Sequence, residues 1–341
     1  MPRQSTIVID RPMKTTIASD NELLSHHMKE GFRLSKNKRF KEAIPILKSA
    51  LELSPSNSKI LSGLAHASRK IGNLDEAIGY YQSLLKYSPR DYRAYCGTGD
   101  CLKGNKQWRA AISNYLKALE INPNDEYSLA GLGDSYRGNK QIEEAIATWK
   151  KLITLNPSNA YVLTRLGDRC RVNKDWDGAI EYYEKVLTLN DKDMFALTGL
   201  GDCYRGKERS NEAIEVWKKI ISITPSNKYI LGRLGDVLRK EKNWQDAIFY
   251  YEKVLKIDPK DLYALTGLYC VYLLGLTDNT KASEIESRIT KIDSSQKILL
   301  MKLGDAYKHE RRFAEAEECF RKLLTIDPTN ESALNKLREI K

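Results

Sequence analysis

Acidic and basic side chains recur in pairs along this chain at a fixed interval. An aspartate follows a glycine at six places, and a lysine or arginine stands three residues after each aspartate. Residues three apart share one face of a helix. Each pair can therefore either neutralise itself or bind a partner's backbone and charged side chains through charge-assisted hydrogen bonds. The six aspartates are Asp100, Asp134, Asp168, Asp202, Asp236 and Asp305.

Catalytic chemistry is not predicted. The run from Gly201 to Lys207 is like the start of a phosphate-binding loop, but Glu208 stands where a serine or threonine would ligate magnesium. No strand precedes the run, and it is in register with the repeated pairs. No set of Ser, His and Asp, or of Cys and His, indicates a nucleophilic site. We therefore expect a protein that is not an enzyme, with no catalytic residue and no cofactor.

Metal binding and membrane insertion are not predicted either. The six cysteines form no CxxC pair, and packing or capping better explains the adjacent His26 and His27. No apolar run is long enough to cross a membrane, and Ile7-Val8-Ile9 is too short for a signal peptide. Reduced thiols then fit a cytoplasmic protein without a metal site.

The Gly-Asp pairs are part of a repeat of 34 residues. A small residue, an alanine and a proline fall into register in nine copies, with few exceptions. A fixed period of this length indicates an array of stacked repeats, which forms one elongated domain. The nine repeats begin at Leu24, Ser58, Tyr92, Glu126, Ala160, Met194, Lys228, Leu262 and Lys297.

Each repeat has the pattern of two helices. In the fourth repeat, residues 127–137 and 143–153 each place apolar side chains on one face. The small Gly133 and Ala145 let the two helices approach closely. Pro157 is expected to end the second helix, and the polar residues around it to cap the next one.

Tryptophans show a second period over the first. Their spacings alternate between 41 and 27 residues, which together make two repeats and indicate duplication of a two-repeat block. Each tryptophan falls on the apolar stripe of a second helix, so we predict core packing rather than stacking on bases or ligands. The five are Trp108, Trp149, Trp176, Trp217 and Trp244.

This pattern resembles the tetratricopeptide repeat (TPR) family, from about Leu24 to Asn330. The resemblance implies an all-α, right-handed superhelical solenoid of nine helix-turn-helix repeats over residues 24–330, whose first helices line a concave groove that binds peptides. The eighth repeat is degenerate, since Tyr269 replaces its glycine. Residues 331–341 are expected to form a solvating helix. Residues 1–23 lack the repeat, and we expect disorder there rather than an extended docking segment.

The resemblance also implies that the second, ninth and twelfth places of each first helix face the groove. Aromatic, aspartate and arginine rows run through five repeats at these places, and we predict that they bind an extended segment of another protein, with mixed charge. The alternative is that aspartate and arginine only neutralise each other, at about 0.2–0.5 kcal/mol per pair. The carboxylate clamp of some relatives is absent. The predicted groove residues are Tyr127, Asp134, Arg137, Tyr161, Asp168, Arg171, Phe195, Asp202, Arg205, Tyr229, Asp236 and Arg239.

The eighth repeat departs from these rows. Its groove places carry Tyr263, Thr266, Cys270, Leu273 and Leu274, which predict an apolar subsite or a self-association surface. The alternative is a degenerate repeat with shifted helix boundaries. The oligomeric state stays open.

Nucleic acid is the second candidate partner. A net charge of +11 and the aromatic row favour RNA binding by a helical-repeat protein. The aspartate row argues against it, because it would repel phosphates. Since 56 basic and 45 acidic residues are interspersed, we favour a protein partner.

Overall fold

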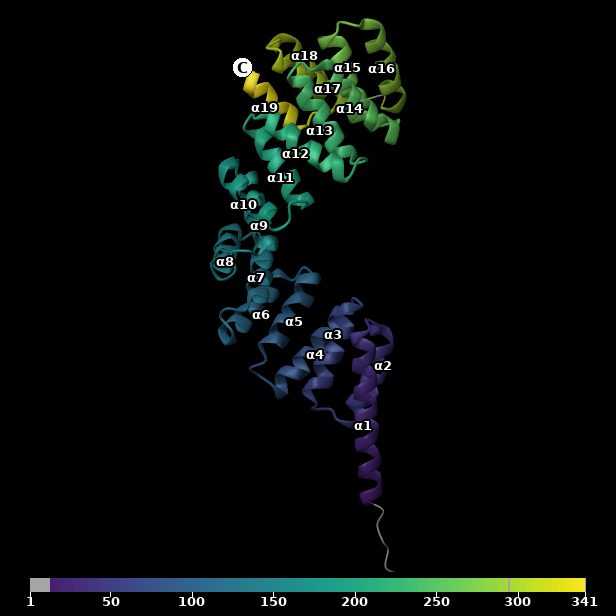
Figure 1. Cartoon of the computed structure of the whole chain (residues 1–341), viewed down its shortest axis with the longest axis vertical. Coiled ribbons are helices and arrows are strands. Elements are labelled where there is room, and N and C mark those ends of the chain that lie inside the picture. The colour runs from purple at the N-terminus through teal and green to yellow at the C-terminus, as the bar shows by residue number, and fades with distance from the viewer. Residues whose placement is uncertain (1–12, 294, 341) are drawn as a thin grey trace, which may run out of the picture. The chain divides into compact units, whose positions relative to one another are not determined.

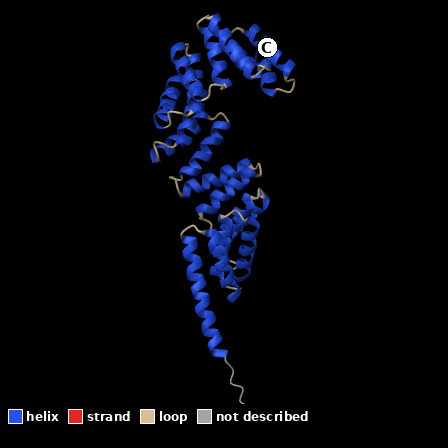
Figure 2. Ribbon diagram, turned by 90° about the vertical axis from the view of Figure 1, so that its right-hand side faces the viewer, coloured by secondary structure: helices blue, strands red, loops and turns tan. Residues whose placement is uncertain are grey.

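The computed structural model describes residues 13–293 and 295–340, and within them the chain consists of helices and turns without a strand (Figures 1 and 2). The predicted all-α fold is confirmed. The chain divides inside one helix into two compact bodies, Met1–Val162 and Leu163–Lys341. We call them the N-terminal body and the C-terminal body, and each is described by itself.

The N-terminal body contains the first four repeats, each a pair of antiparallel helices joined by a short turn. Its helices are α1 (Met13–Lys36), α2 (Phe40–Leu53), α3 (Ser58–Lys70), α4 (Leu74–Tyr87), α5 (Tyr92–Gly104), α6 (Trp108–Ile121), α7 (Glu126–Gly138) and α8 (Ile142–Leu155), followed by the start of α9 (Ala160–Val172).

The C-terminal body continues the same pairing from α9 onward. Its remaining elements are α10 (Trp176–Leu189), α11 (Met194–Gly206), α12 (Ser210–Ile223), α13 (Lys228–Lys240), α14 (Trp244–Ile257), α15 (Leu262–Cys270), the π-helix η1 (Val271–Gly275), α16 (Asn279–Ile292), α17 (Lys297–His309), α18 (Phe313–Ile326) and α19 (Glu331–Ile340). Helix α19 packs against α18.

The N-terminal extension differs from the expectation in part. Residues 1–12 lie outside the described residues. Residues 13–23 belong to α1 and do not form the disordered segment that the sequence indicated. The physical reason is that no glycine or proline stands between Met13 and Leu24, so the helix of the first repeat can extend toward the N-terminus.

Polar caps and helix stops lie where the repeat places them. Asp125 accepts a hydrogen bond from the Ser128 backbone N–H at 2.8 Å, and Asp193 accepts one from Ala196 at 2.9 Å. Helix α8 ends two residues before Pro157, as predicted. Helix α10 ends at the equivalent place although Asp191 replaces the proline, so the proline reinforces this stop but is not required for it.

Large rings fill the space that the glycines leave. Trp149 is fully buried on α8 and packs on Gly133, where a Cβ atom would lie 2.3 Å from its Nε1. Tyr115 holds the same place one repeat earlier, and its ring also reaches Gly131 of the following repeat. This place alternates tyrosine and tryptophan along the chain, in step with the two-repeat duplication: Tyr115, Trp149, Tyr183, Trp217 and Tyr251, all of them buried.

The remaining tryptophans occupy a second kind of packing site. Trp108 begins α6 and lies over Gly138 at the end of the next first helix. Trp176 meets Gly206 and Trp244 meets Gly275 in the same way. These three rings are half-buried, so they pack between successive repeats rather than in the centre of one. The predicted core packing therefore describes Trp149 and Trp217, whereas the other three tryptophans pack between repeats.

Gly133→Ala should destabilise the N-terminal body by about 1–3 kcal/mol, because its Cβ has no room beside Trp149. Gly79→Ala is the matched control. No atom lies within 4 Å of a Cβ at Gly79, and an exposed helical glycine replaced by alanine stabilises by about 1 kcal/mol. Urea unfolding followed by circular dichroism measures both, and equal effects of the two substitutions would contradict the packing role of Gly133.

Burial governs the chemistry of the cysteines. Five of the six are buried and Cys170 is partly exposed. Burial raises the pKa of Cys96 to about 12 and that of Cys101 to about 11. The thiolate is the reactive form. These two thiols therefore react slowly, because they stay protonated and because reagents cannot reach them.

We expect a thiol-specific disulfide reagent at about pH 8 to modify Cys170 quickly in the native protein and the five buried cysteines only on unfolding. A Cys170→Ser variant should then lose the fast phase of the absorbance change. Retention of the fast phase in this variant would contradict the burial pattern.

Candidate functional site

The first helices of successive repeats form the inner layer of each body. In the N-terminal body α1 contacts α3, α3 contacts α5, and α5 contacts α7, while in the C-terminal body α13 contacts α15. The predicted aspartate, arginine and aromatic rows all lie on these helices.

Asp100 on α5 is held by side chains from three directions. Its two carboxylate oxygens accept hydrogen bonds from the Tyr115 hydroxyl of its own repeat at 2.7 Å and from the Tyr127 hydroxyl of the next repeat at 2.6 Å. Arg69 of the preceding repeat forms an ion pair with it. Only 10% of the Asp100 side chain is exposed. The carboxylate therefore joins three successive repeats.

The same joint recurs in the C-terminal body. Asp236 accepts hydrogen bonds from Tyr251 of its own repeat and Tyr263 of the next, and Lys302 pairs with it at 2.8 Å. Burial opposes the ionisation of Asp236, but Lys302 and Arg239 outweigh it, so its pKa lies below the ordinary range. In the first of these sites, burial and the Asp100 carboxylate raise the pKa of Tyr115. The Tyr115 hydroxyl therefore stays protonated and donates its hydrogen bond.

The repeat that carries Trp217 uses another donor. The Trp217 ring has no hydroxyl, and Asp202 of that repeat pairs instead with Arg233 of the next repeat at 2.6 Å. Arg233 occupies the sixth place of its first helix, where the repeats after a tyrosine have glycine, as at Gly199 and Gly267. The Arg233 side chain therefore occupies the space that a tyrosine ring fills in the repeats with glycine at this place.

The aspartate row thus performs structural work that the sequence interpretation did not assign to it. Asp168 is the more exposed exception in the rows, because Phe195 in the following repeat has no hydroxyl to reach it. Among the described residues only Tyr183 donates a hydrogen bond to Asp168, at 2.8 Å. The sequence held a signal for the missed donors, since glycine and arginine alternate at the sixth place with the two-repeat period.

The aromatic row presents its rings to solvent. Phe195 is 79% exposed, and about half of the surface is exposed at Tyr127, Tyr161, Tyr229 and Tyr263. Tyr127, Tyr161 and Tyr263 anchor their hydroxyls on aspartates of the preceding repeat. Rings that are fixed at one end and open on the face lose little conformational freedom when a partner binds.

The arginine row divides into exposed and buried members. The side chains of Arg137 and Arg205 remain nearly half exposed, and that of Arg171 about one third. Arg239 is 9% exposed and thus lies in the interior. The groove places of the sequence pattern are therefore not equivalent in the folded chain.

The predicted apolar subsite in the eighth repeat requires a correction. Cys270 and Thr266 are buried, and Leu273 and Leu274 are half-buried. The reason is that α15 ends at Cys270 and continues as η1, while α17 packs on α15 and covers this face. Of the residues predicted for this subsite, Tyr263 remains exposed over 43% of its surface. The alternative with shifted helix boundaries describes the structure better.

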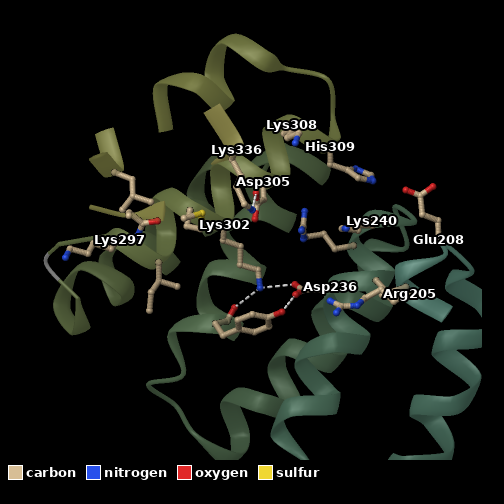
Figure 3. Close-up of a pocket in the computed structure, with 17 residues that line it drawn as sticks. Arg205, Glu208, Asp236, Lys240, Lys297, Lys302, Asp305, Lys308, His309 and Lys336 are labelled. Atoms are coloured by element: carbon tan, nitrogen blue, oxygen red, sulfur yellow. Dashed lines mark hydrogen bonds and ion pairs between the residues drawn. The ribbon is translucent and has the colours of Figure 1, made fainter. Parts of the chain in front are cut away.

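Two pockets lie on the inner layer of the C-terminal body. The smaller, of about 370 Å³, is lined by Tyr229, Arg233 and Tyr263 together with Arg205. The larger, of about 910 Å³, is lined by Asp236, Arg239, Tyr263 and Lys302 among others (Figure 3). In the N-terminal body a pocket of about 350 Å³ borders Asp100 and Tyr127. Each pocket therefore contains members of the predicted rows.

Within the described part of the chain, no group of three His, Cys, Asp or Glu side chains could hold a metal ion. In the same residues no helix is long and apolar enough to cross a membrane.

Tyr127→Phe should lower the free energy of unfolding by about 1 kcal/mol, because it removes a hydrogen bond to the Asp100 carboxylate and keeps the ring. Tyr87→Phe is the matched control, since the Tyr87 ring is equally exposed on the same body and makes no hydrogen bond within the described residues. Urea unfolding measures both. A loss in the control as large as that in Tyr127→Phe would contradict a stabilising role for the hydrogen bond between Tyr127 and Asp100.

Solved structures similar to this chain include a repeat protein. The C-terminal part of a TPR repeat-containing protein from Cytophaga hutchinsonii is 16% identical, with a TM-score of 0.52, over 80% of this chain and 98% of that one. PilF from Pseudomonas aeruginosa is 19% identical, with a TM-score of 0.52, over 61% of this chain and 94% of that one. MamA from Desulfovibrio magneticus RS-1 is 22% identical, with a TM-score of 0.47, over 50% and 97%. These likenesses concern the fold.

Sequence comparison gives the family directly. No curated protein matches the chain. Models of the tetratricopeptide repeat match residues 34–97, 92–125, 114–147, 131–194, 196–227, 229–261 and 298–330. The matches leave out the whole eighth repeat, where α15 is short and η1 follows. With matched repeats over most of its length and the same paired-helix fold, the chain belongs to the tetratricopeptide repeat family.

Proposed function

We propose that this protein is a non-catalytic scaffold whose inner helices bind an extended segment of a partner protein. The observation that carries the proposal is the exposed aromatic face of the C-terminal body. Phe195 projects from α11 with 79% of its surface exposed, although the fold offers other first-helix rings a hydrogen-bond anchor. Exposed aromatic rings at interfaces supply large contact areas at low entropy cost.

The charges beside these rings favour a more acidic segment than the sequence indicated. Asp202 is buried among Arg233, Arg205 and Arg171. The arginine side chains extend farther into solvent than the aspartate does. The surface that a partner meets is therefore aromatic and basic, rather than a set of equal acidic and basic rows.

RNA binding is the second candidate, and one observation favours it. The buried aspartates present less repulsive charge to phosphates than a free row would. Against it, the inner cations are largely paired, as Arg171 is with Asp168 at 3.6 Å and with Asp202 at 3.8 Å. Nucleic-acid binding depends on cations that neutralise phosphates and release counterions, so we favour a protein partner.

The test uses Phe195, because substitutions of the aspartates would also weaken the fold. Segments of about 15 residues, selected from a random-sequence display library, are measured by fluorescence anisotropy. We expect Phe195→Ser to weaken binding about tenfold, a loss of about 1.4 kcal/mol. Phe249→Ser is the matched control, because Phe249 is half exposed on the second helix α14, and it should change binding by about twofold or less.

Three results would contradict the proposal. Selection could yield no binding segment, or Phe195→Ser and Phe249→Ser could weaken binding equally. The third is a single-stranded RNA that binds tightly, loses affinity steeply with salt and depends on Phe195, which would establish the second candidate instead.

A further inference from the structure

The larger pocket of the C-terminal body has an excess of positive charge. Seven lysine and arginine side chains line it, against three carboxylates. Figure 3 shows cations from α11, α13, α17 and α19 around one space. The basic residues are Arg205, Arg239, Lys240, Lys297, Lys302, Lys308 and Lys336, and the acidic ones are Glu208, Asp236 and Asp305.

Several of these cations are already paired. Lys302 pairs with Asp236 at 2.8 Å, and Lys336 pairs with Asp305. Lys308 and Lys297 are held by acids outside the pocket lining, Glu339 at 2.6 Å and Asp327 at 3.4 Å. These pairs fix the walls of the pocket but do not satisfy every cation in it.

Arg239 is a buried cation of this pocket, and among the described residues it forms no close ion pair. Its side chain lines the pocket with 91% of the residue buried, and no carboxylate of the described residues lies within 4.0 Å of its guanidinium nitrogens. Its Nε also lacks a hydrogen-bond partner. Burial opposes the charge of Arg239, but Tyr251 and Asp236 outweigh it, so the pKa of Arg239 lies above its ordinary range and the guanidinium stays charged. A guanidinium suits a carboxylate, which it can bind through two hydrogen bonds.

Lys240 and Arg205 extend the positive charge to the pocket mouth. Lys240 is exposed and forms no ion pair within the described residues. Arg205 reaches only 3.8 Å from Asp202 and stays 43% exposed. Apolar side chains line the same pocket, among them Ile298 and Met301. This mixture fits side chains that combine an aliphatic stem with a carboxylate.

We infer that this pocket binds an acidic segment of the partner protein, with glutamate or aspartate side chains reaching Arg239 and Lys240. The inference rests on the proposed peptide-binding function and names the chemistry of its ligand. A carboxylate suits the pocket better than a phosphate backbone, because Asp236, Asp305 and Glu208 lie among the cations and would repel closely spaced phosphates.

The probe is a fluorescein-labelled peptide of about ten residues that alternates glutamate and serine, beside the same peptide with glutamine in place of glutamate. We expect the glutamate peptide to bind the full chain, the glutamine peptide to bind at least tenfold more weakly, and salt to reduce the difference. Equal binding of the two peptides, or no binding of either, would overturn the inference.

Matched variants locate the site. Lys240→Glu should weaken the glutamate peptide at least fivefold, and Arg239→Gln at least tenfold. Lys218→Glu makes the same change of net charge on the exposed face of α12 and should leave the affinity within about twofold. Circular dichroism checks the fold of Arg239→Gln, and the exposed Lys240 gives a second readout if that variant unfolds. An equal loss in Lys218→Glu would mean general charge attraction and would overturn the site.

The two proposals fail separately. If selected segments depend on Phe195 but ignore Lys240 and Arg239, the scaffold function stands and the acidic-segment inference fails. If the glutamate peptide depends on Lys240 while no selected segment depends on Phe195, the pocket binds acid and the proposed groove function fails. If an oligouridylate displaces the glutamate peptide and binds more tightly, the pocket is a nucleic-acid contact and the inference is wrong.

Discussion

The repeats are joined by buried or half-buried carboxylates that accept hydrogen bonds from neighbours on both sides. Asp100 accepts hydrogen bonds from Tyr115 and Tyr127 and forms an ion pair with Arg69. These three side chains come from three successive repeats. An apolar face stacks repeats without fixing their mutual rotation, whereas these contacts are directional and costly to leave unsatisfied. The aspartate therefore explains why tyrosine, glycine and arginine occupy their particular places around it.

This joint also determines what remains for a partner. The hydroxyl of Tyr127 is used by the fold while the face of its ring is open. Phe195 has no hydroxyl and so donates no hydrogen bond to Asp168. The Asp168 side chain is more exposed than that of Asp100. In one side chain the hydroxyl thus makes a structural contact while the ring is open to a partner. The aromatic rings, rather than the aspartates, form the outward surface of the inner helices.

The eighth repeat shows how a local change alters chemistry at a distance. Its first helix ends early at Cys270, and Lys302 of the ninth repeat reaches Asp236 of the seventh. The pocket around Arg239 is lined by residues of α13, α15 and α17, and α17 packs directly on α15. The basic pocket therefore lies beside the degenerate repeat, on the first helices that flank it and on Tyr263 of its own first helix.

The sequence by itself determined the helix pairs, their stops and the glycine-ring packing, because these depend on residues in a fixed local register. The 34-residue period sets which residues meet within one repeat, as Gly133 meets Trp149. It could not decide which polar side chains pair between repeats, since several donors compete for one carboxylate and only the packed geometry selects among them. Tyrosine reaches Asp168 and arginine reaches Asp202 because the neighbouring ring differs. For the same reason only the tertiary structure buried Cys270 and Arg239 while leaving Phe195 in solvent.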